Sequence, residues 1–167
     1  MTGSVVIEPL NSTHDRKSFY CGVAVLDRYL REQASQDVKR RVSNCFVACA
    51  AGDSAVVAYY TLAASSIPLT DLPEAETKRL PRYPLLPATL IGRLAVDNRH
   101  RGRQFGSVLL ADALRRGIQA APASFTLLVD AKDEIAAAFY RKHGFIPLAS
   151  RPRSLFLPVA TALKLFA

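Results

Sequence analysis

Cysteine is scarce in this sequence, and the few glycines and prolines follow no repeat. The 167 residues include 3 cysteines, 8 glycines and 10 prolines. The three cysteines, Cys21, Cys45 and Cys49, match neither a zinc ribbon nor a CxxC redox motif, so we expect buried thiols. Glycine and proline are too sparse and too aperiodic for a fibrous protein. With half of its residues hydrophobic, the chain is also too apolar for disorder, and we expect a globular protein.

Long apolar runs are missing as well. The opening residues, MTGSVVIEPL, have neither the basic start nor the apolar core of a signal peptide, and no stretch is long enough to span a bilayer. We therefore expect a cytoplasmic protein that does not contact a membrane.

Several catalytic and metal-binding patterns are absent. His14, His100 and His143 are scattered without an HxxxH pair or a His/Cys/Asp cluster, so we expect no metal and three ordinary surface histidines. No GxSxG serine is present, which disfavours a hydrolase. No lysine follows Gly106 as a Walker loop requires, and no GxGxxG opens a strand–helix unit, which disfavours nucleotide hydrolysis and dinucleotide binding.

Acidic residues are in the minority. There are 14 of them against 22 lysines and arginines, giving a net charge of +8. A basic balance of this size favours a polyanionic partner, either a nucleic acid or a phosphate-rich cofactor. Charge alone does not choose between them.

The first half of the chain combines a strand, a helix and a hairpin. Residues 4–9 form an expected strand, and a helix is expected within residues 19–41. On that helix Val23, Leu26, Tyr29, Leu30 and Gln33 share one face, opposite Arg28, Arg31 and Glu32. Two β-rich runs joined at residues 51–53 are expected to pair antiparallel.

The second half alternates strands and helices. Five prolines between residues 67 and 88 allow one short helix at most, in a surface loop. The elements expected after it are a strand near residues 88–96, a helix over 107–119, a strand over 124–130, a helix from Asp133 to Arg141, a strand from Gly144, and a C-terminal strand and helix that close the sheet. We expect one α/β domain over residues 1–167, with a mixed central sheet flanked by helices and the strand near 88–96 at its centre.

The turn between the central strand and its helix, within GRLAVDNRHRGRQFGSVLLADAL, predicts a phosphate site. A helix that opens directly from such a turn directs free N–H groups and its positive dipole end at one point. Gly102 and Gly106 permit close approach to the main chain, while Arg99, Arg101 and Arg103 are placed to neutralise a multiply charged group. The alternative reading of the same pattern is a solvated basic loop.

This tract resembles the GNAT superfamily of acetyl-coenzyme-A-dependent N-acetyltransferases. Residues 101–106, RGRQFG, follow the pyrophosphate-loop pattern Arg/Gln-x-x-Gly-x-Gly/Ala, although Gln104 stands where the first motif glycine is usual. The later tract AKDEIAAAFYRKHGFIPL is similar to the second GNAT signature, a helix that ends in Phe-Tyr before a Gly-Phe strand start. The resemblance implies a GNAT-like fold, acetyl-CoA as cosubstrate, and the coenzyme-binding residues Leu94, Ala95, Val96, Arg101, Gly102, Arg103, Gln104, Phe105, Gly106, Ser107 and Phe139.

A narrower group of GNAT proteins is also similar over roughly residues 17–160. The tracts FYCGVAVLDRYLREQA, VVAYYTLAASSI, GRLAVD and AAAFYRKHGF resemble the TacT-like toxins of bacterial type II toxin–antitoxin modules. That resemblance implies transfer of an acetyl group to the α-amino group of aminoacyl-tRNA, a block of translation, and inhibition by a ribbon-helix-helix antitoxin.

Tyr140 matches the catalytic tyrosine of the family and is the expected general acid for the leaving thiolate, since a phenol with a pKa near 10 is close enough to an alkyl thiol for protonation. The alternative is a core aromatic that packs on Phe139. An α-amino group has a pKa of about 7.7 to 8, so this acceptor needs no strong general base.

The expected tRNA contacts are basic side chains. Arg93 either orients the acceptor end of the tRNA or forms a structural salt bridge. The others are Arg28, Arg31, Lys39, Arg40, Arg41, Lys78, Arg79 and Arg82, for each of which a solvated basic face is the alternative.

Two other functions are consistent with the same sequence. One is a GNAT acetyltransferase that acts on a protein N-terminus, a lysine or a small amine. The other is a noncatalytic nucleic-acid-binding module, which only the basic charge supports. A homodimer contact through the apolar C-terminal segment is a further expectation.

Overall fold

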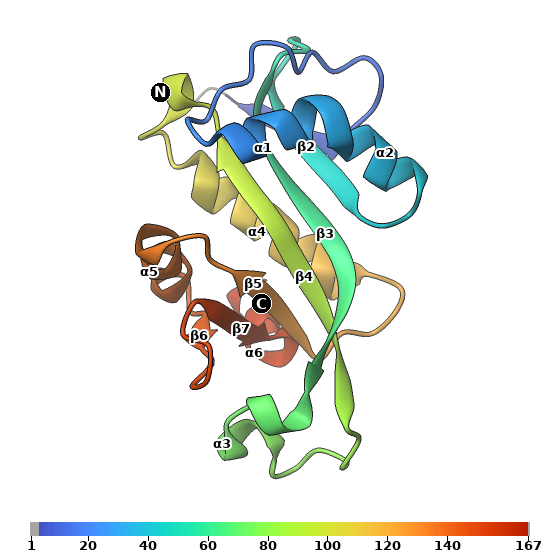
Figure 1. Cartoon of the computed structure of the whole chain (residues 1–167), viewed down its shortest axis with the longest axis vertical. Coiled ribbons are helices and arrows are strands. Elements are labelled where there is room, and N and C mark those ends of the chain that lie inside the picture. Colours follow the sequence, from blue (N-terminus) through green and yellow to red (C-terminus); the bar gives the residue numbers. More distant parts are fainter. Residues whose placement is uncertain (1–3, 167) are drawn as a thin grey trace. The chain divides into compact units, whose positions relative to one another are not determined.

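The computed structural model describes residues 4–166, and Figure 1 shows its strands and helices. The strands are β1 (Val5–Pro9), β2 (Asn44–Ala50), β3 (Val56–Pro68), β4 (Leu85–Val96), β5 (Thr126–Asp130), β6 (Ile146–Pro147) and β7 (Ser154–Pro158). The α-helices are α1 (Ala24–Arg28), α2 (Ala34–Lys39), α3 (Glu74–Thr77), α4 (Phe105–Gln119), α5 (Glu134–Lys142) and α6 (Val159–Leu163). A π-helical turn, η1 (Tyr29–Gln33), and the 3-10 turns η2 (Leu69–Asp71), η3 (Asn98–His100) and η4 (Lys164–Phe166) complete the described elements.

The seven strands form one mixed sheet in the order β1-β2-β3-β4-β5-β7-β6. β2 and β3 pair antiparallel across the turn at residues 51–53, and β4 and β5 pair parallel. β4 is the middle strand of the seven, so the predicted mixed sheet with its centre near residues 88–96 is confirmed. The chain divides into two compact units, residues 1–63 with 92–115 and residues 64–91 with 116–167, and the single domain predicted over 1–167 stays a prediction.

The first unit packs its N-terminal helical segment on the β2–β3 hairpin. α1, η1 and α2 run as one continuous helical segment across β2 and β3 in Figure 1. Tyr29, Leu30 and Ala34 of this segment belong to one buried cluster with residues of β2, β3 and β4, including Tyr59 and Ala95. Burial of apolar side chains in this cluster is what fixes the helical segment on the sheet.

The helical segment departs from the predicted periodicity at its middle turn. The Ala34 N–H donates to the Tyr29 carbonyl, five residues earlier, which makes η1 a π-helical turn. The wider turn rotates all later residues, so Ala34 is fully buried and Gln33 is exposed. The prediction that Gln33 shares the apolar face was therefore wrong, because it assumed 3.6 residues per turn throughout.

The same segment ends in a Schellman motif that carries an arginine in place of glycine. Arg41 donates its N–H to the Val38 carbonyl, and Val42 donates to the Asp37 carbonyl. Arg41 has a φ of 60°, a left-handed conformation that favours glycine. One of the predicted tRNA contacts thus occupies a position at which its backbone is strained.

The second unit is built on β5 and its neighbours. Thr126–Val129 of β5 pair with Ala88–Ile91 of β4, and β7 pairs antiparallel with β5 on one side and with β6 on the other. Ile67, Leu86, Leu148 and Phe156 form a buried cluster in this unit. The C-terminal strand and helix are confirmed as β7 and α6, but β7 lies between β5 and β6 and does not close the sheet. α6 and η4 leave Leu163 and Leu165 exposed, and the dimer contact there stays a prediction.

Buried polar and sulfur groups differ partly from expectation. All three cysteines are buried free thiols, as predicted. His14 is buried, which corrects the prediction of a surface histidine: its Nδ1 accepts from the Asn11 N–H, and its Nε2 lies 2.7 Å from Glu8 Oε1. Within residues 4–166 no three His, Cys, Asp or Glu side chains gather as a metal site would need. No helix in the same range combines the length and apolarity that crossing a bilayer requires.

Candidate active site

Asp97, the residue after β4, organises the turn that leads to α4. Its side chain is fully buried and accepts four hydrogen bonds, from the N–H, Nε and Nη2 of Arg99 at 2.9 to 3.1 Å and from the Tyr20 N–H at 3.0 Å. Burial by itself raises the pKa of the Asp97 carboxyl, but these hydrogen bonds outweigh it and lower the pKa to about 2. The carboxylate therefore ties the turn to the segment before α1. The sequence analysis does not single out Asp97, although an aspartate that follows a strand is a common N-cap of the next helical turn.

Two of the three arginines in the turn bond backbone carbonyls of the segment before α1. The Arg99 guanidinium bonds Asp97 and also donates to the Ser18 carbonyl at 3.3 Å. Arg101 donates through Nη2 to the Cys21 carbonyl at 2.6 Å. Arg103 is exposed, and its Nη1 lies 3.4 Å from His100 Nδ1. Arg99 and Arg101 thus shape the turn, and Arg103 is the one best placed to meet a ligand phosphate directly.

The loop between η3 and α4, which the sequence predicts to bind phosphate, contains two residues with a positive φ. Gly102 has a φ of 78° and open space where a Cβ would stand, and Gln104 has a φ of 61°. Gln104, at the position where the GNAT pattern has glycine, therefore keeps the left-handed conformation that glycine favours. α4 begins at the next residue, and its first N–H groups point back along the helix axis toward the loop. Phe105 is buried, and Gly106 and Ser107 are half-buried in this first turn.

Leu94, Ala95 and Val96 are the last three residues of β4. Ala95 is buried in the cluster below the helical segment, and Leu94 and Val96 are half-buried. The parallel ladder with β5 involves residues 88–91, and these three residues lie farther along the strand. They precede the turn and loop that lead to α4, and their contact with the coenzyme stays a prediction.

Tyr140, in the second unit, is held by the way α5 begins and ends. Asp133 caps the helix by accepting from the Ala136 N–H at 2.8 Å, at the position where the sequence predicted the helix to begin. At the other end Gly144, with a φ of 94°, forms a Schellman motif in which Phe145 donates to the Tyr140 carbonyl. The Phe145 ring then packs edge-on against Tyr140 at 5.5 Å, the hydrophobic contact that accompanies this motif. The Phe-Tyr and Gly-Phe pairs of the second signature thus both contribute to holding Tyr140 in place.

The Tyr140 hydroxyl is the only polar part of an otherwise buried side chain. The residue is 7% exposed, and the rings of Phe139 and Phe145 flank it. No group among residues 4–166 hydrogen-bonds the Tyr140 hydroxyl. Every side-chain oxygen in that range that is fully shielded from solvent has a hydrogen-bond partner. The hydroxyl oxygen is therefore not fully enclosed. Burial raises the pKa of Tyr140 to about 12, above the ordinary value used in the sequence analysis.

Comparison with known proteins assigns the family. Residues 42–147 match the family described as acetyltransferase (GNAT) domain, which is more than half of the chain. The chain belongs to the GNAT acetyltransferases.

Two relatives of this acetyltransferase match over nearly their full length. "Probable toxin TacT" of Sinorhizobium fredii (strain NBRC 101917 / NGR234) is 32% identical over 170 residues, which cover 96% of this chain and 94% of the relative. The "tRNA-acetylating toxin" of Mycobacterium tuberculosis (strain ATCC 25618 / H37Rv) is 35% identical over 167 residues, covering 99% and 98%. The solved structure of AtaT complexed with acetyl-methionyl-tRNAfMet is 29% identical, covers 98% of this chain and all of that one, and has a TM-score of 0.91. The related AtaTR structure is bound with acetyl-CoA.

Arg93 of the acetyltransferase makes a contact that neither sequence-based alternative foresaw. Its guanidinium carbon lies 3.6 Å from the centroid of the Tyr29 ring, a cation–π arrangement. Tyr29 in turn donates its hydroxyl to Asp37 Oδ2 at 2.9 Å. Burial and this hydrogen bond raise the pKa of Tyr29 to about 12. Stacking holds the half-buried Arg93 side chain in place, and its role toward tRNA stays a prediction.

The other basic side chains predicted to contact tRNA are all exposed and divide between the two units. Arg28, Arg31, Lys39, Arg40 and Arg41 belong to the first unit. Lys78, Arg79 and Arg82 belong to the second, where the proline-rich segment contains the single short helix α3, as predicted. Exposure agrees equally with tRNA contact and with a solvated basic face.

Backbone strain at Gln104 leads to a prediction. Replacing Gln104 by glycine is expected to raise the free energy of unfolding by about 0.5 to 1 kcal/mol and to leave the Kd for acetyl-CoA within about threefold, because glycine adopts the same φ without strain. Replacing it by valine, whose branched Cβ disfavours a left-handed backbone, is expected to weaken acetyl-CoA binding at least about tenfold. Urea unfolding and calorimetric titration measure the two effects. Gln119→Gly, at the end of α4, is the control and is expected to lower stability. Equal acetyl-CoA binding by the glycine and valine variants would contradict the assigned role of this backbone.

Proposed function

We propose that this chain is a toxin that acetylates the α-amino group of aminoacyl-tRNA with acetyl-CoA and so blocks translation. The observation that carries the proposal is its full-length similarity to a tRNA-acetylating toxin, which extends beyond the region matched by the GNAT family as a whole. The excess of eight positive charges favours a polyanionic acceptor over a cationic one.

The proposed acceptor, an α-amino group, needs no strong general base. With a pKa of about 7.7 to 8, which the neighbouring ester lowers, an α-amino group is largely neutral at pH 7 to 8. A lysine side chain, with a pKa of about 10.4, would need a general base. The neutral nitrogen attacks the thioester carbonyl carbon, the carbon–sulfur bond breaks, and the coenzyme leaves as a thiol.

Each part of the chain has a role in this proposal. The coenzyme supplies the acetyl thioester and a pyrophosphate for residues 101–107 to hold. Backbone N–H groups of residues 94–96 polarise the thioester carbonyl. Phe139 packs beside the coenzyme, and the Tyr140 hydroxyl donates a hydrogen bond toward the departing sulfur, which takes up the proton that the acceptor amine loses. Arg93 and the exposed basic residues contact the tRNA.

The partner that we propose is a ribbon-helix-helix antitoxin, acting in the cytoplasm where charged tRNA is found. Related toxins provide the support: AtaT has been solved with the C-terminus of the antitoxin AtaR, and the AtaT-AtaR complex has been solved bound to DNA. A toxin and its antitoxin bound together to DNA are consistent with a DNA-binding antitoxin.

The deciding experiment supplies radiolabelled acetyl-CoA and purified protein with total tRNA, either charged or deacylated. Label is expected on charged tRNA alone, and mild alkaline hydrolysis of the ester is expected to release it as N-acetyl amino acid. Label on deacylated tRNA would contradict acetylation of the amino acid.

The second candidate keeps the chemistry and changes the acceptor to a protein N-terminus, a lysine or a small amine. The match to the GNAT family favours it equally, since that family is defined by the acetyl donor. Peptides with a free N-terminus or an internal lysine, assayed by release of coenzyme thiol, separate the two. Acetylation of a peptide, with no label on any tRNA, would replace the first proposal by this one.

A further inference from the structure

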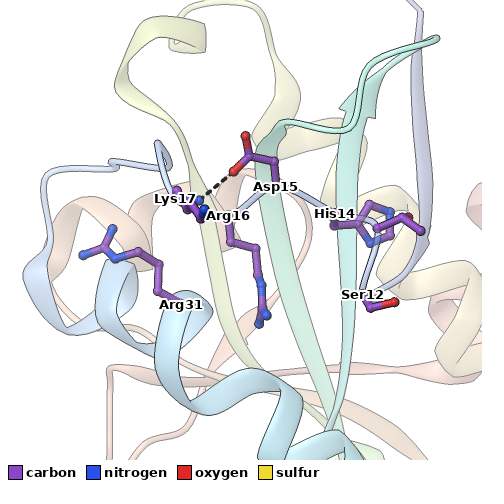
Figure 2. A pocket seen from close by; sticks show the side chains of 7 residues that line it. Ser12, His14, Asp15, Arg16, Lys17 and Arg31 are labelled. Atoms are coloured by element: carbon purple, nitrogen blue, oxygen red, sulfur yellow. Dashed lines mark hydrogen bonds between the residues drawn. The ribbon is translucent and has the colours of Figure 1, made fainter.

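The first unit contains a polar pocket that the proposed chemistry does not use. It has a volume of about 510 Å³, in the range of small-ligand sites, and it is lined by residues 12–17 and Arg31. Figure 2 shows Arg16 and Lys17 on the loop before α1 and Arg31 on the helical segment that faces this loop. Three cations and a single carboxylate, that of Asp15, give the lining a positive charge.

The loop that carries the pocket is fixed to the hairpin. The Asp15 N–H donates to the Ser54 carbonyl at 2.8 Å, and the Val56 N–H donates to the Asp15 carbonyl at 2.9 Å. The Asp15 carboxylate accepts from the Lys17 N–H at 3.0 Å, the bond drawn in Figure 2. The side chains of this loop therefore start from a rigid backbone, which lowers the entropy lost when they bind a ligand.

The three cations are engaged to different degrees. Arg16 is half-buried and donates to the Leu30 carbonyl and to Ser35 Oγ, so it holds the helical segment. Arg31 is exposed and donates from Nη1 to the Phe19 carbonyl at 2.9 Å, which uses one of its five N–H donors. Lys17 is exposed, and no group among residues 4–166 pairs with its ammonium. Lys17 and the remaining donors of Arg31 are available to an anion.

An exposed aromatic ring follows on the same segment. Tyr20, three residues after Lys17, is 61% exposed. Its N–H donates to Asp97 and its carbonyl accepts from the Asn98 N–H at 2.9 Å, so its backbone is held on both sides. An exposed ring on a fixed backbone, close in sequence to cations, is an arrangement with which proteins stack an unpaired base while neutralising the adjoining phosphate.

We propose that the pocket of residues 12–17 and Arg31, together with Tyr20, is an RNA subsite that binds a backbone phosphate and stacks one unpaired nucleotide. The hydroxyls of Ser12 and Thr13 add the neutral donors that often accompany cations at phosphates. In this chain the RNA is the acceptor tRNA, so the inference rests on the proposed function. Of the residues involved, only Arg31 was among the tRNA contacts predicted from sequence. An acidic peptide matches the charge but gives the Tyr20 ring no base to stack on.

The test replaces Lys17 by glutamine, because this side chain has no structural contact to lose. KM for aminoacyl-tRNA is expected to rise about fivefold, and the slope of log kcat/KM against log salt to fall by about 1, the loss of one phosphate contact. KM for acetyl-CoA is expected to stay the same. Lys17→Arg, which keeps the charge, is expected to restore both values, and Lys164→Gln, at an exposed lysine of η4, is the control. An unchanged salt slope in the Lys17→Gln variant would overturn the phosphate assignment.

A second variant tests the stacking and separates this inference from the proposed function. Tyr20→Leu is expected to weaken binding of tRNA with an unpaired 3′ end about tenfold and binding of a blunt RNA duplex little. Binding of uncharged tRNA, measured by fluorescence anisotropy, does not depend on acetylation. If wild-type protein labels no tRNA but the Lys17→Gln and Tyr20→Leu variants still lose RNA affinity, the proposed function fails and the subsite stands. If both variants bind RNA as wild type does and lose affinity only for an acidic antitoxin peptide, the RNA subsite is wrong.

Discussion

Replacing Tyr140 by phenylalanine is expected to lower kcat by about 100- to 1,000-fold, the usual effect of removing one hydrogen-bond donor to charge that develops in the transition state. The substitution keeps the ring that packs on Phe139 and Phe145 and removes only the hydroxyl, which no described residue binds. Stability is therefore expected to change by less than about 1 kcal/mol. KM for both substrates is expected to stay within about threefold, because an interaction made only in the transition state acts on kcat.

The measurement is steady-state release of coenzyme thiol by both proteins, with urea unfolding to verify the fold. Tyr83→Phe removes the hydroxyl of an exposed tyrosine in the same unit and is the matched control, expected to retain wild-type kcat. A Tyr140→Phe variant that retains kcat within about threefold would assign Tyr140 to the core alone.

The raised pKa of Tyr140 sets the pH dependence of this step. With a pKa of about 12 the phenol stays protonated at every pH at which aminoacyl-tRNA survives. The ordinary pKa of an alkyl thiol, about 8.5, is lower, so the phenol stabilises developing charge on sulfur chiefly as a hydrogen-bond donor. The rate is therefore expected to rise with pH as the acceptor amine loses its proton, with no fall from Tyr140 ionisation between pH 6 and about 9.

Replacing Asp97 by asparagine is expected to destabilise the protein by about 2 to 3 kcal/mol at pH 7 and to raise KM for acetyl-CoA. Both carboxylate oxygens accept hydrogen bonds, Oδ1 from the Arg99 N–H and Nε, and Oδ2 from Arg99 Nη2 and the Tyr20 N–H. An asparagine keeps one acceptor oxygen and places an NH₂ group against two donors in a site with no exposure. The turn before the coenzyme loop then loses its anchor to the segment before α1.

The destabilisation is expected to depend on pH in a defined direction. The folded-state pKa of Asp97, about 2, is below the unfolded value, so ionised Asp97 contributes stability that is fully present above about pH 4 and is lost as pH falls through about 2. That contribution is about 2 kcal/mol. The stability difference between the two proteins is therefore expected to shrink by about this amount as the pH falls from 5 to 2.

Urea unfolding at several pH values, with a calorimetric titration of acetyl-CoA, measures these effects. Asp53→Asn, in the β2–β3 turn, is the matched control, since its side chain is exposed and accepts one bond that asparagine also accepts. A difference between wild type and Asp97→Asn that stays constant from pH 5 to pH 2 would contradict the assigned pKa shift.

The parts of the fold that follow from local pattern were predictable. Two β-rich runs joined at residues 51–53 predicted the β2–β3 hairpin, and the sequence predicted a helix from Asp133 to Arg141 where the structure has α5. The π-helical turn η1 was not predictable by the same method, because a helical-periodicity argument assumes one turn length throughout. The burial of His14 depends on tertiary contacts with Glu8 and Asn11 that spacing does not reveal.

The candidate site was predictable where its chemistry lies in a contiguous motif. The coenzyme loop and Tyr140 each belong to such a motif. The internal bonds of Arg99 and Arg101 to carbonyls about 80 residues earlier in the chain were not predictable, since nothing local marks those carbonyls as partners. The exposed Tyr20 and Lys17 were missed for the same reason: only the fold brings their segment against Asp97 and the hairpin.

Gln104 changes how the first GNAT signature should be searched for. A sequence pattern that requires glycine at this position does not match this chain, although the Gln104 backbone has the left-handed conformation that glycine favours. The signature is better defined by backbone dihedral angles. Asparagine, aspartate and glutamine are then allowed at this position, at a modest cost in folding stability. A homologue with asparagine or glutamine at this site carries a side-chain amide on the loop, which a homologue with glycine lacks.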